Sequence, residues 1–293
     1  MEGWIMNKPL FQGVCTALVT PFLDGAVNYP MMEQLLRRQL DAGIKAVLIS
    51  GTTGEAPTLT DEEKLELFHR AKSFVGDDCL ILAGTGCNST ARTAELSFAA
   101  QEEGVDGLLI VSPYYNKATE EGLVAHYLTI AHSVRIPIIL YNVPSRTGVD
   151  IPVSVYRRLA PLPNVVGVKE AGKDLTKVTK TCSTCGEFFV WTGNDDYTVP
   201  AMSLGAQGVI SVLSNVLPEE TTAMTDAMLA GDLDTATALQ QQLQPLIDLL
   251  FCEVNPIPVK AAMKYLGYDC GGCRLPLTEL SKENKKQLED YLG

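Results

Sequence analysis

The sequence has little positive charge and no long apolar run. Its 293 residues carry 23 Lys and Arg against 35 Asp and Glu, and the resulting net charge of −12 argues against non-specific binding to nucleic acid or to an anionic membrane. No segment approaches the roughly 18 consecutive apolar residues that a membrane span requires. The N-terminus, residues 1–7, lacks the basic and apolar regions of a secretory signal. We therefore expect a cytoplasmic protein, with Met6 as a second candidate start.

Histidine is scarce and occurs only as His69, His126 and His132. All three fall in segments with helical periodicity, away from strand ends, so we expect them at the surface. In such positions they cannot form a three-histidine metal site or a Ser-His-Asp triad. A Gly-x-Gly-x-x-Gly motif is also missing after the first expected strand, which argues against a dinucleotide-binding fold.

Cysteine, in contrast, occurs eight times and forms two Cys-x-x-Cys pairs, Cys182/Cys185 and Cys270/Cys273. Zinc ribbons place two such pairs close together, whereas 85 positions separate Cys185 from Cys270. No thioredoxin-like pattern surrounds either pair. We expect free thiols and no bound metal; a Cys-x-x-Cys metalloprotein is the alternative.

Short apolar segments alternate with amphipathic helical segments along most of the chain. Helix-start patterns separate them, including a capping box at Thr60 and Glu63, the Asn88–Thr90 segment, and Thr119. Eight β/α units in about 230 residues favour an α/β fold closed as a (β/α)8 TIM barrel over an open sheet. The expected strands are Val14–Thr20, Ala46–Ser50, Leu80–Gly84, Leu108–Ser112, Ile138–Tyr141, Val165–Lys169, Phe188–Thr192 and Gly208–Val212.

The rest of the chain has a purely helical pattern. From about Asp232 onwards we expect helices at Leu233–Phe251, Pro258–Leu266 and Leu277–Leu292. We therefore divide the chain into a catalytic barrel, residues 1–231, and a C-terminal helical domain, residues 232–293.

The segment Asn164–Gly172 contains the main catalytic candidate, Lys169. The apolar residues before it predict a strand that is buried on both faces. Alternation along this strand places Lys169 on the same face as Gly167 and Val165, with open space beside the glycine. Because burial of an ammonium is costly, the neutral amine is favoured there, and a neutral lysine is a Schiff-base nucleophile. The alternative is a lysine that ends its strand and extends to water.

Two threonines follow the second expected strand. Thr52 and Thr53 stand between Gly51 and Gly54, a composition that suits a carboxylate-binding turn with exposed N–H groups and equally suits a plain βα turn. In a (β/α)8 barrel the active site lies at the carboxyl ends of the strands, which is where this turn is expected.

Tyrosines and an arginine occupy two further strand ends. Tyr115 follows the fourth expected strand, Tyr141 ends the fifth, and Arg146 comes shortly afterwards. A tyrosine at such a position often serves packing alone. Together with the amine of Lys169, however, phenols that pass protons and a guanidinium that binds a carboxylate form a coherent Schiff-base site.

Two other polar features compete for a role. Asp195 and Asp196 follow the seventh expected strand and suit either a metal or the capping of a helix N-terminus, of which we expect capping. Lys260 is the rival lysine. It follows two prolines, so we expect it at a helix start in the C-terminal region and not inside the barrel.

These motifs, in this order, resemble the dihydrodipicolinate synthase family of the N-acetylneuraminate lyase superfamily. The resemblance implies a (β/α)8 barrel with a C-terminal helical domain. It also implies a cofactor-free lyase that condenses pyruvate with L-aspartate-4-semialdehyde in lysine and diaminopimelate biosynthesis. The matching segments are Gly13–Pro21, Gly51–Glu55, Ala83–Gly86, Pro113–Asn116, Tyr141–Gly148, Gly167–Glu170 and Asn255–Lys260.

The resemblance also implies catalytic roles. Lys169 would form an imine with pyruvate and then an enamine. Tyr141, Thr52 and Tyr115 would form a proton relay, with Tyr115 reaching into the site of a neighbouring subunit. This exchange implies an oligomer, and the family is usually a homotetramer built as a dimer of tight dimers.

The remaining implied roles concern binding. Thr53 would hold the carboxylate of pyruvate, Arg146 would pair with the carboxylate of the semialdehyde, and the main chain of Gly193 and Ile210 would line the pocket. Relatives that cleave sugar acids generally lack the arginine, so a sugar-acid aldolase is the first rival function. A catalytically silent barrel with a binding or regulatory role is the second, and the joint presence of the catalytic residues argues against it.

One departure from the family pattern concerns regulation. Feedback-sensitive members bind lysine through serine, histidine and glutamate side chains, some of which are replaced here by cations. We therefore expect weak or absent inhibition by lysine. The replaced positions are Ala56, Asp61, Lys64 and Arg92, while Asn88 and Tyr114 are retained.

Overall fold

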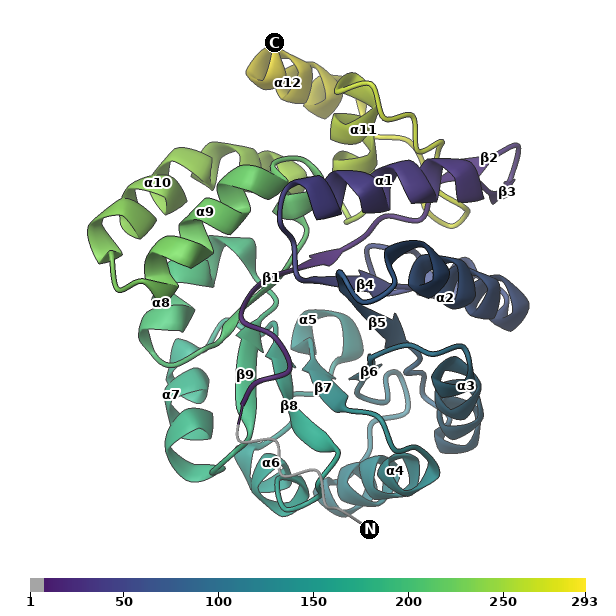
Figure 1. The fold of residues 1–293 in the computed structure, drawn as a ribbon, viewed down its shortest axis with the longest axis vertical. Coiled ribbons are helices and arrows are strands. Elements are labelled where there is room, and N and C mark those ends of the chain that lie inside the picture. The colour runs from purple at the N-terminus through teal and green to yellow at the C-terminus, as the bar shows by residue number, and fades with distance from the viewer. Residues whose placement is uncertain (1–7) are drawn as a thin grey trace.

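The computed structural model describes residues 8–293, so the expectations for the N-terminal segment lie outside the described residues. Eight parallel strands close into a barrel in the order β1-β10-β9-β8-β7-β6-β5-β4 (Figure 1). This confirms the predicted (β/α)8 fold. The strands are β1 (Gly13–Ala17), β4 (Ala46–Ile49), β5 (Leu80–Gly84), β6 (Gly107–Val111), β7 (Ile138–Asn142), β8 (Val165–Glu170), β9 (Phe189–Thr192) and β10 (Gly208–Ser211).

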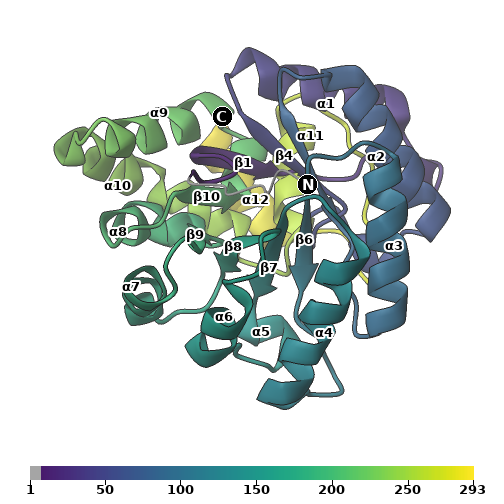
Figure 2. The same ribbon diagram turned by 60° about the horizontal axis from the view of Figure 1, so that its bottom comes forward.

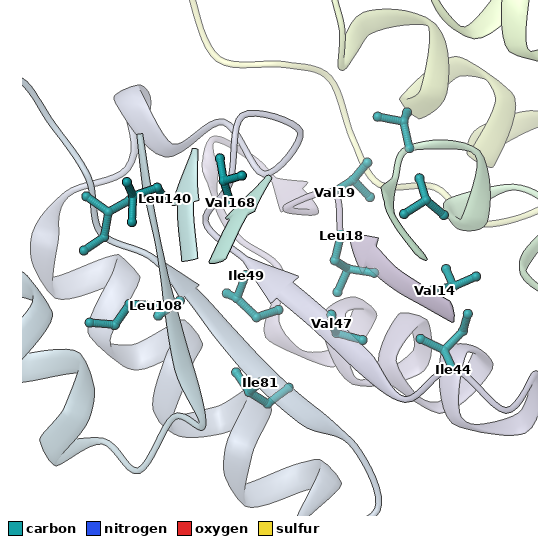
Figure 3. Close-up of a cluster of buried hydrophobic side chains, with 14 of the residues drawn as sticks. Val14, Leu18, Val19, Ile44, Val47, Ile49, Ile81, Leu108, Leu140 and Val168 are labelled. Atoms are coloured by element: carbon teal, nitrogen blue, oxygen red, sulfur yellow. The ribbon is translucent and has the colours of Figure 1, made fainter. Parts of the chain in front are cut away.

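The strands are apolar on both faces because each face packs against a different core. Val47 and Val168 belong to the outer core, between the strands and the surrounding helices (Figure 3). Leu48 and Trp191 belong to the inner core, which fills the barrel. Neighbouring residues such as Val47 and Leu48 point to opposite faces, as the two-residue period of a strand requires.

Helices surround the strands (Figure 2). The capping box is present, because Glu63 N–H donates to Thr60 Oγ1 over 3.2 Å and Thr60 N–H donates to the Glu63 carboxylate over 3.0 Å. Thr119 accepts from Gly122 N–H in the same way. The helices are α1 (Tyr29–Asp41), α2 (Asp61–Val75), α3 (Thr90–Glu102), α4 (Glu120–Ser133), α5 (Pro144–Thr147), α6 (Val153–Leu159), α7 (Leu175–Thr184), α8 (Thr198–Ser203) and α9 (Pro218–Leu229).

The first strand is shorter than predicted. It ends at Ala17, because Val19 N–H donates to the side chain of Asn215 over 3.1 Å instead of to a neighbouring strand. The chain then leaves the barrel and forms a small hairpin, β2 (Phe22–Leu23) and β3 (Ala26–Val27).

Three helices complete the chain: α10 (Leu233–Leu250), α11 (Ile257–Tyr265) and α12 (Lys282–Leu292). In Figure 1, α11 lies beside α1, and Arg38 of α1 lies 3.9 Å from the sulfur of Met263 in α11. The last helix, α12, packs against α10 and α11. The predicted start of the last helix at Leu277 was wrong, because Ser281 accepts from Asn284 N–H and begins the helix there. Within residues 8–293, no helix is long and apolar enough to cross a membrane.

One histidine contradicts the expected surface position. His69 and His132 are exposed, but His126 is buried where α4 packs on α3, with its Nδ1 2.9 Å from Thr90 Oγ1. Its Nε2 has no hydrogen-bond partner among the described residues. Burial of the imidazole lowers the pKa of His126 to about 4.

This burial predicts a pH-dependent stability. In the unfolded chain the pKa of His126 returns to near 6.5, so protonation favours unfolding, and stability is lost as the pH falls from 6.5 towards 4. The full effect is of the order of 3 kcal/mol. Thermal unfolding of His126→Gln should therefore show a smaller decrease of Tm over this pH range than the parent chain.

His132→Gln is the matched control, because it removes an exposed histidine from the same helix and should retain the parent's pH dependence. Identical pH profiles for His126→Gln and the parent would show that His126 does not contribute.

Candidate active site

Lys169 and Tyr141 form the centre of the site at the carboxyl ends of β8 and β7. They are partners in the strand register, and Lys169 Nζ lies 4.6 Å from the centroid of the Tyr141 ring. Only 6% of Lys169 and 7% of Tyr141 are exposed. The lysine therefore does not extend to water, and its amine is held against a phenol inside the barrel.

The predicted neighbours of Lys169 on its face of the strand were partly wrong. A β-bulge separates the pairs Ile138–Val165 and Ile139–Gly167, and the alternation of side chains shifts there. As a result Val165 packs in the outer core, while Val166 belongs to the inner core.

The space beside Gly167 is also filled and not open as expected. A Cβ atom at this position would lie 2.1 Å from the carbonyl oxygen of Phe189 and 2.9 Å from the ring of Trp191. The glycine thus allows β9 and the indole to approach closely beneath the catalytic candidate. The indole thus provides apolar surroundings beside Lys169, on the inner face of the barrel.

The residues that follow Tyr141 and Lys169 join the two strands on the opposite face. Asn142 and Glu170 are register partners, and Asn142 Nδ2 donates to Glu170 Oε1 over 2.7 Å. Tyr156 and the backbone of Gly172 also donate to this carboxylate. Burial raises the pKa of Glu170, although the nearby Lys177 opposes this shift. The sequence interpretation missed this pair, and its adjacency to Tyr141 and Lys169 was the available signal.

The turn after β4 presents the two threonines differently. Thr53 is buried, and its Oγ1 accepts from Asn255 Nδ2 over 3.0 Å. Thr52 is partly exposed and lines a cavity of about 350 Å³ together with Tyr141 and Arg146. The structure therefore brings residues from the carboxyl ends of two separate strands, β4 and β7, to one cavity.

Of the other binding candidates, Arg146 lines this cavity, while Gly193 lies beside Lys169 and Ile210 lies in the core with Tyr141. Arg146 lies on α5 with an exposed side chain, and its Nη2 is 3.5 Å from the carbonyl oxygen of Asn255. A Cβ atom at Gly193 would lie 2.7 Å from Lys169 Cε, so only glycine fits beside the lysine. Ile210 is fully buried in the inner core that also contains Tyr141.

Tyr115 is exposed and is not among the residues that line the cavity of its own chain. It lies in the loop after β6, its φ is 70°, and 87% of the residue is exposed. The side chain is thus directed away from Lys169 and Tyr141.

The two competing polar residues, Asp195 and Lys260, form hydrogen bonds or ion pairs within the protein. Asp195 accepts from the N–H groups of Val212 and Leu213, so it caps the helical turn that follows β10 and not its own helix. Burial raises the pKa of this carboxyl. Lys260 lies in α11, as predicted, and pairs with Glu55 at 2.5 Å.

A second group of charges lines the outer part of the same cavity. Arg92 Nη2 lies 3.1 Å from both carboxylate oxygens of Asp61, and Lys64 Nζ lies 3.4 Å from the same carboxylate. Two cations therefore share one anion. Ala56 and Tyr114 also line this part of the cavity.

The cysteines are free thiols, including both Cys-x-x-Cys pairs. Burial raises the pKa of Cys270 to about 12 and that of Cys273 to about 11, which keeps these thiols protonated. Nowhere in the described part of the chain do three or more His, Cys, Asp or Glu side chains form a group suited to a metal ion.

Comparison with known proteins places this arrangement in a family. The model of the Dihydrodipicolinate synthetase family matches residues 10–293. The 4-hydroxy-tetrahydrodipicolinate synthase of Acetivibrio thermocellus is 43% identical over 291 residues, which cover 98% of this chain and 99% of that protein.

Solved structures agree. Dihydrodipicolinate synthase from Aquifex aeolicus is 43% identical, with a TM-score of 0.95 over 96% of this chain and 97% of that one. The chloride-inhibited dihydrodipicolinate synthase of Acinetobacter baumannii, complexed with pyruvate, is 40% identical, with a TM-score of 0.94 over 96% and 98% of the two chains. The chain therefore belongs to the dihydrodipicolinate synthetase family, and its activity is the 4-hydroxy-tetrahydrodipicolinate synthase reaction, a lyase reaction of lysine and diaminopimelate biosynthesis.

Proposed function

We propose that the chain joins pyruvate to L-aspartate-4-semialdehyde through an imine on Lys169. The observation that carries this proposal is the buried amine of Lys169 over the ring of Tyr141. The amine attacks the ketone carbon of pyruvate, and water leaves as the imine forms. The imine withdraws electrons from the methyl group, which loses a proton to give an enamine. No cofactor is needed for this activation.

The second half of the reaction releases the lysine. The enamine carbon attacks the aldehyde carbon of the semialdehyde, and a new carbon–carbon bond forms. The amino group of the semialdehyde then attacks the imine carbon, closes the ring and displaces the amine of Lys169. The enzyme returns to its starting state.

Hydroxyl groups in the cavity move the protons of these steps. Tyr141 contacts Lys169, and Thr52 lines the same cavity, so both are within reach of the reacting atoms. Tyr115 completes the relay from a second copy of the chain, which accounts for its exposed position. We propose a homotetramer, a dimer of tight dimers, in which this tyrosine is exchanged.

Each of the two substrate carboxylates has its own binding residue. Thr53, with its hydroxyl and N–H, holds the carboxylate of pyruvate. Arg146 binds the carboxylate of the semialdehyde with its two-pronged guanidinium. Gly193 and Ile210 complete the wall beside the lysine.

Reductive trapping tests the imine. Borohydride added with pyruvate should inactivate the enzyme and leave a reduced, covalently bound three-carbon acid on the peptide that contains Lys169, as peptide mass mapping would show. Lys260, a second buried amine, is the internal control and should stay unmodified. Modification elsewhere, or none at all, would contradict the proposed nucleophile.

Arg146→Ala separates the two halves of the reaction. The variant loses a charge-assisted contact to the semialdehyde, which corresponds to about 1.5–3 kcal/mol or one to two decades in kcat/KM. Pyruvate should still be trapped on Lys169. Ser145→Ala, at the neighbouring exposed position, is the matched control. Full activity of Arg146→Ala, or activity of the parent with N-acetylneuraminate, would refute the assigned specificity.

Inhibition by lysine should be weak. Lys64 and Arg92 share the single carboxylate of Asp61, so this part of the cavity has an excess of positive charge that repels the ammonium groups of free lysine. Initial rates measured with added lysine should remain near the uninhibited value. Substantial inhibition at sub-millimolar lysine would disprove this.

A further inference from the structure

The buried carboxylate of Glu55 joins the threonine turn to the C-terminal helices. Glu55 Oε1 lies 2.5 Å from Lys260 Nζ, and the two side chains are 0% and 3% exposed. Glu55 Oε2 accepts from the backbone N–H of Arg274 over 2.8 Å. Lys260 also donates to the carbonyl oxygen of Gly272 over 3.0 Å. Both oxygens of a carboxylate in the barrel are thus held by the segment 260–274.

The backbone of Glu55 is part of the threonine turn itself. Its N–H donates to the carbonyl oxygen of Thr52 over 3.0 Å, and Ala56 N–H donates to that of Gly51 over 3.2 Å. Its φ is 56°, a left-handed conformation that is strained for a residue with a side chain. A displacement of Glu55 would therefore be transmitted directly to Thr52.

A second contact from the same C-terminal segment reaches Thr53. Asn255, five residues before Lys260, donates from Nδ2 to Thr53 Oγ1, and its carbonyl oxygen lies 3.5 Å from Arg146 Nη2. Arg274 extends the attachment, because its guanidinium binds Glu63 and the carbonyl oxygen of Thr58. The segment 255–274 thus contacts Arg146, which lines the cavity, and the turn that contains Thr52 and Thr53.

We propose that the Lys260–Glu55 ion pair is a positioning device that holds Thr52 and Thr53 in place for reaction. Stability alone is a poor explanation, because replacing a buried ion pair by neutral groups of similar volume is often neutral or stabilising. Geometry is a better one, because a displacement of about 1 Å in a reacting group costs up to a hundredfold in rate. The proposal rests on the roles assigned above to the two threonines.

The test compares the double variant Glu55→Gln/Lys260→Met with the parent chain. The double variant removes both buried charges, so its Tm should stay close to that of the parent, but the loosened turn should lower kcat about tenfold or more and raise KM for pyruvate. The rate of borohydride trapping at Lys169 should fall as well. Activities are compared at a temperature at which circular dichroism shows each variant to be folded.

Lys264→Met is the matched control. Lys264 lies one turn further along α11 in an exposed ion pair with Asp269, at 65% and 61% exposure, so its loss should change neither kcat nor trapping. Glu55→Gln alone is the second variant; its amide keeps one oxygen acceptor in place of two, and kcat should decrease less than in the double variant.

The possible outcomes are distinct. A double variant, or Glu55→Gln if the double variant does not fold, with the parent's kcat, KM and trapping rate would overturn the positioning role. Activity that decreases only in proportion to the unfolded fraction would overturn it as well. If the parent and Lys264→Met themselves fail to trap pyruvate on Lys169, the proposed function is what fails.

Discussion

The structure depends on keeping an amine inside a protein core. Lys169 is enclosed because its strand belongs to a closed barrel, and each face of that sheet packs against a different layer of side chains. The contact with Tyr141 follows from strand pairing, since the two residues occupy matched positions on neighbouring strands. Asn142 and Glu170 reinforce the same pairing from outside. The hydrogen bonds that pair β7 with β8 in the barrel therefore also set the distance between Lys169 and Tyr141.

The fold was predictable because it is encoded locally. Eight apolar segments with helix starts such as Thr60 between them require only short-range patterns, and the catalytic candidates were found by asking which residues end those segments. The shift of Val165 to the outer core was not predictable in this way. The bulge arises from the hydrogen bonds of β8 to β7, and these depend on a strand that lies elsewhere in the sequence.

Contacts between residues that are far apart in the sequence could not be predicted from local patterns either. Lys260 was correctly placed in a C-terminal helix, but its partner Glu55 is 205 positions away, and no local pattern joins them. His126 occupies a helical position that a surface residue also suits, and only the packing of α4 on α3 decides its burial. Tyr115 shows the converse, because its position at a strand end alone suggested a place near the lysine, whereas 87% of the residue is exposed. Only the family resemblance implied a place in the site of a neighbouring subunit.

The indole of Trp191 bears on the route by which substrates reach Lys169. It stacks on Phe11 with ring centroids 4.9 Å apart, and its N–H donates to the carbonyl oxygen of Phe11. These two side chains help to fill the interior of the barrel. In a (β/α)8 barrel the substrates approach from the carboxyl ends of the strands, and Arg146 lines the cavity at this end. In the reaction proposed above, an aldehyde bound at this arginine would stand in the path of the keto acid. Under the proposed roles, the order in which the two substrates bind would follow from the filled interior of the barrel, without a moving lid.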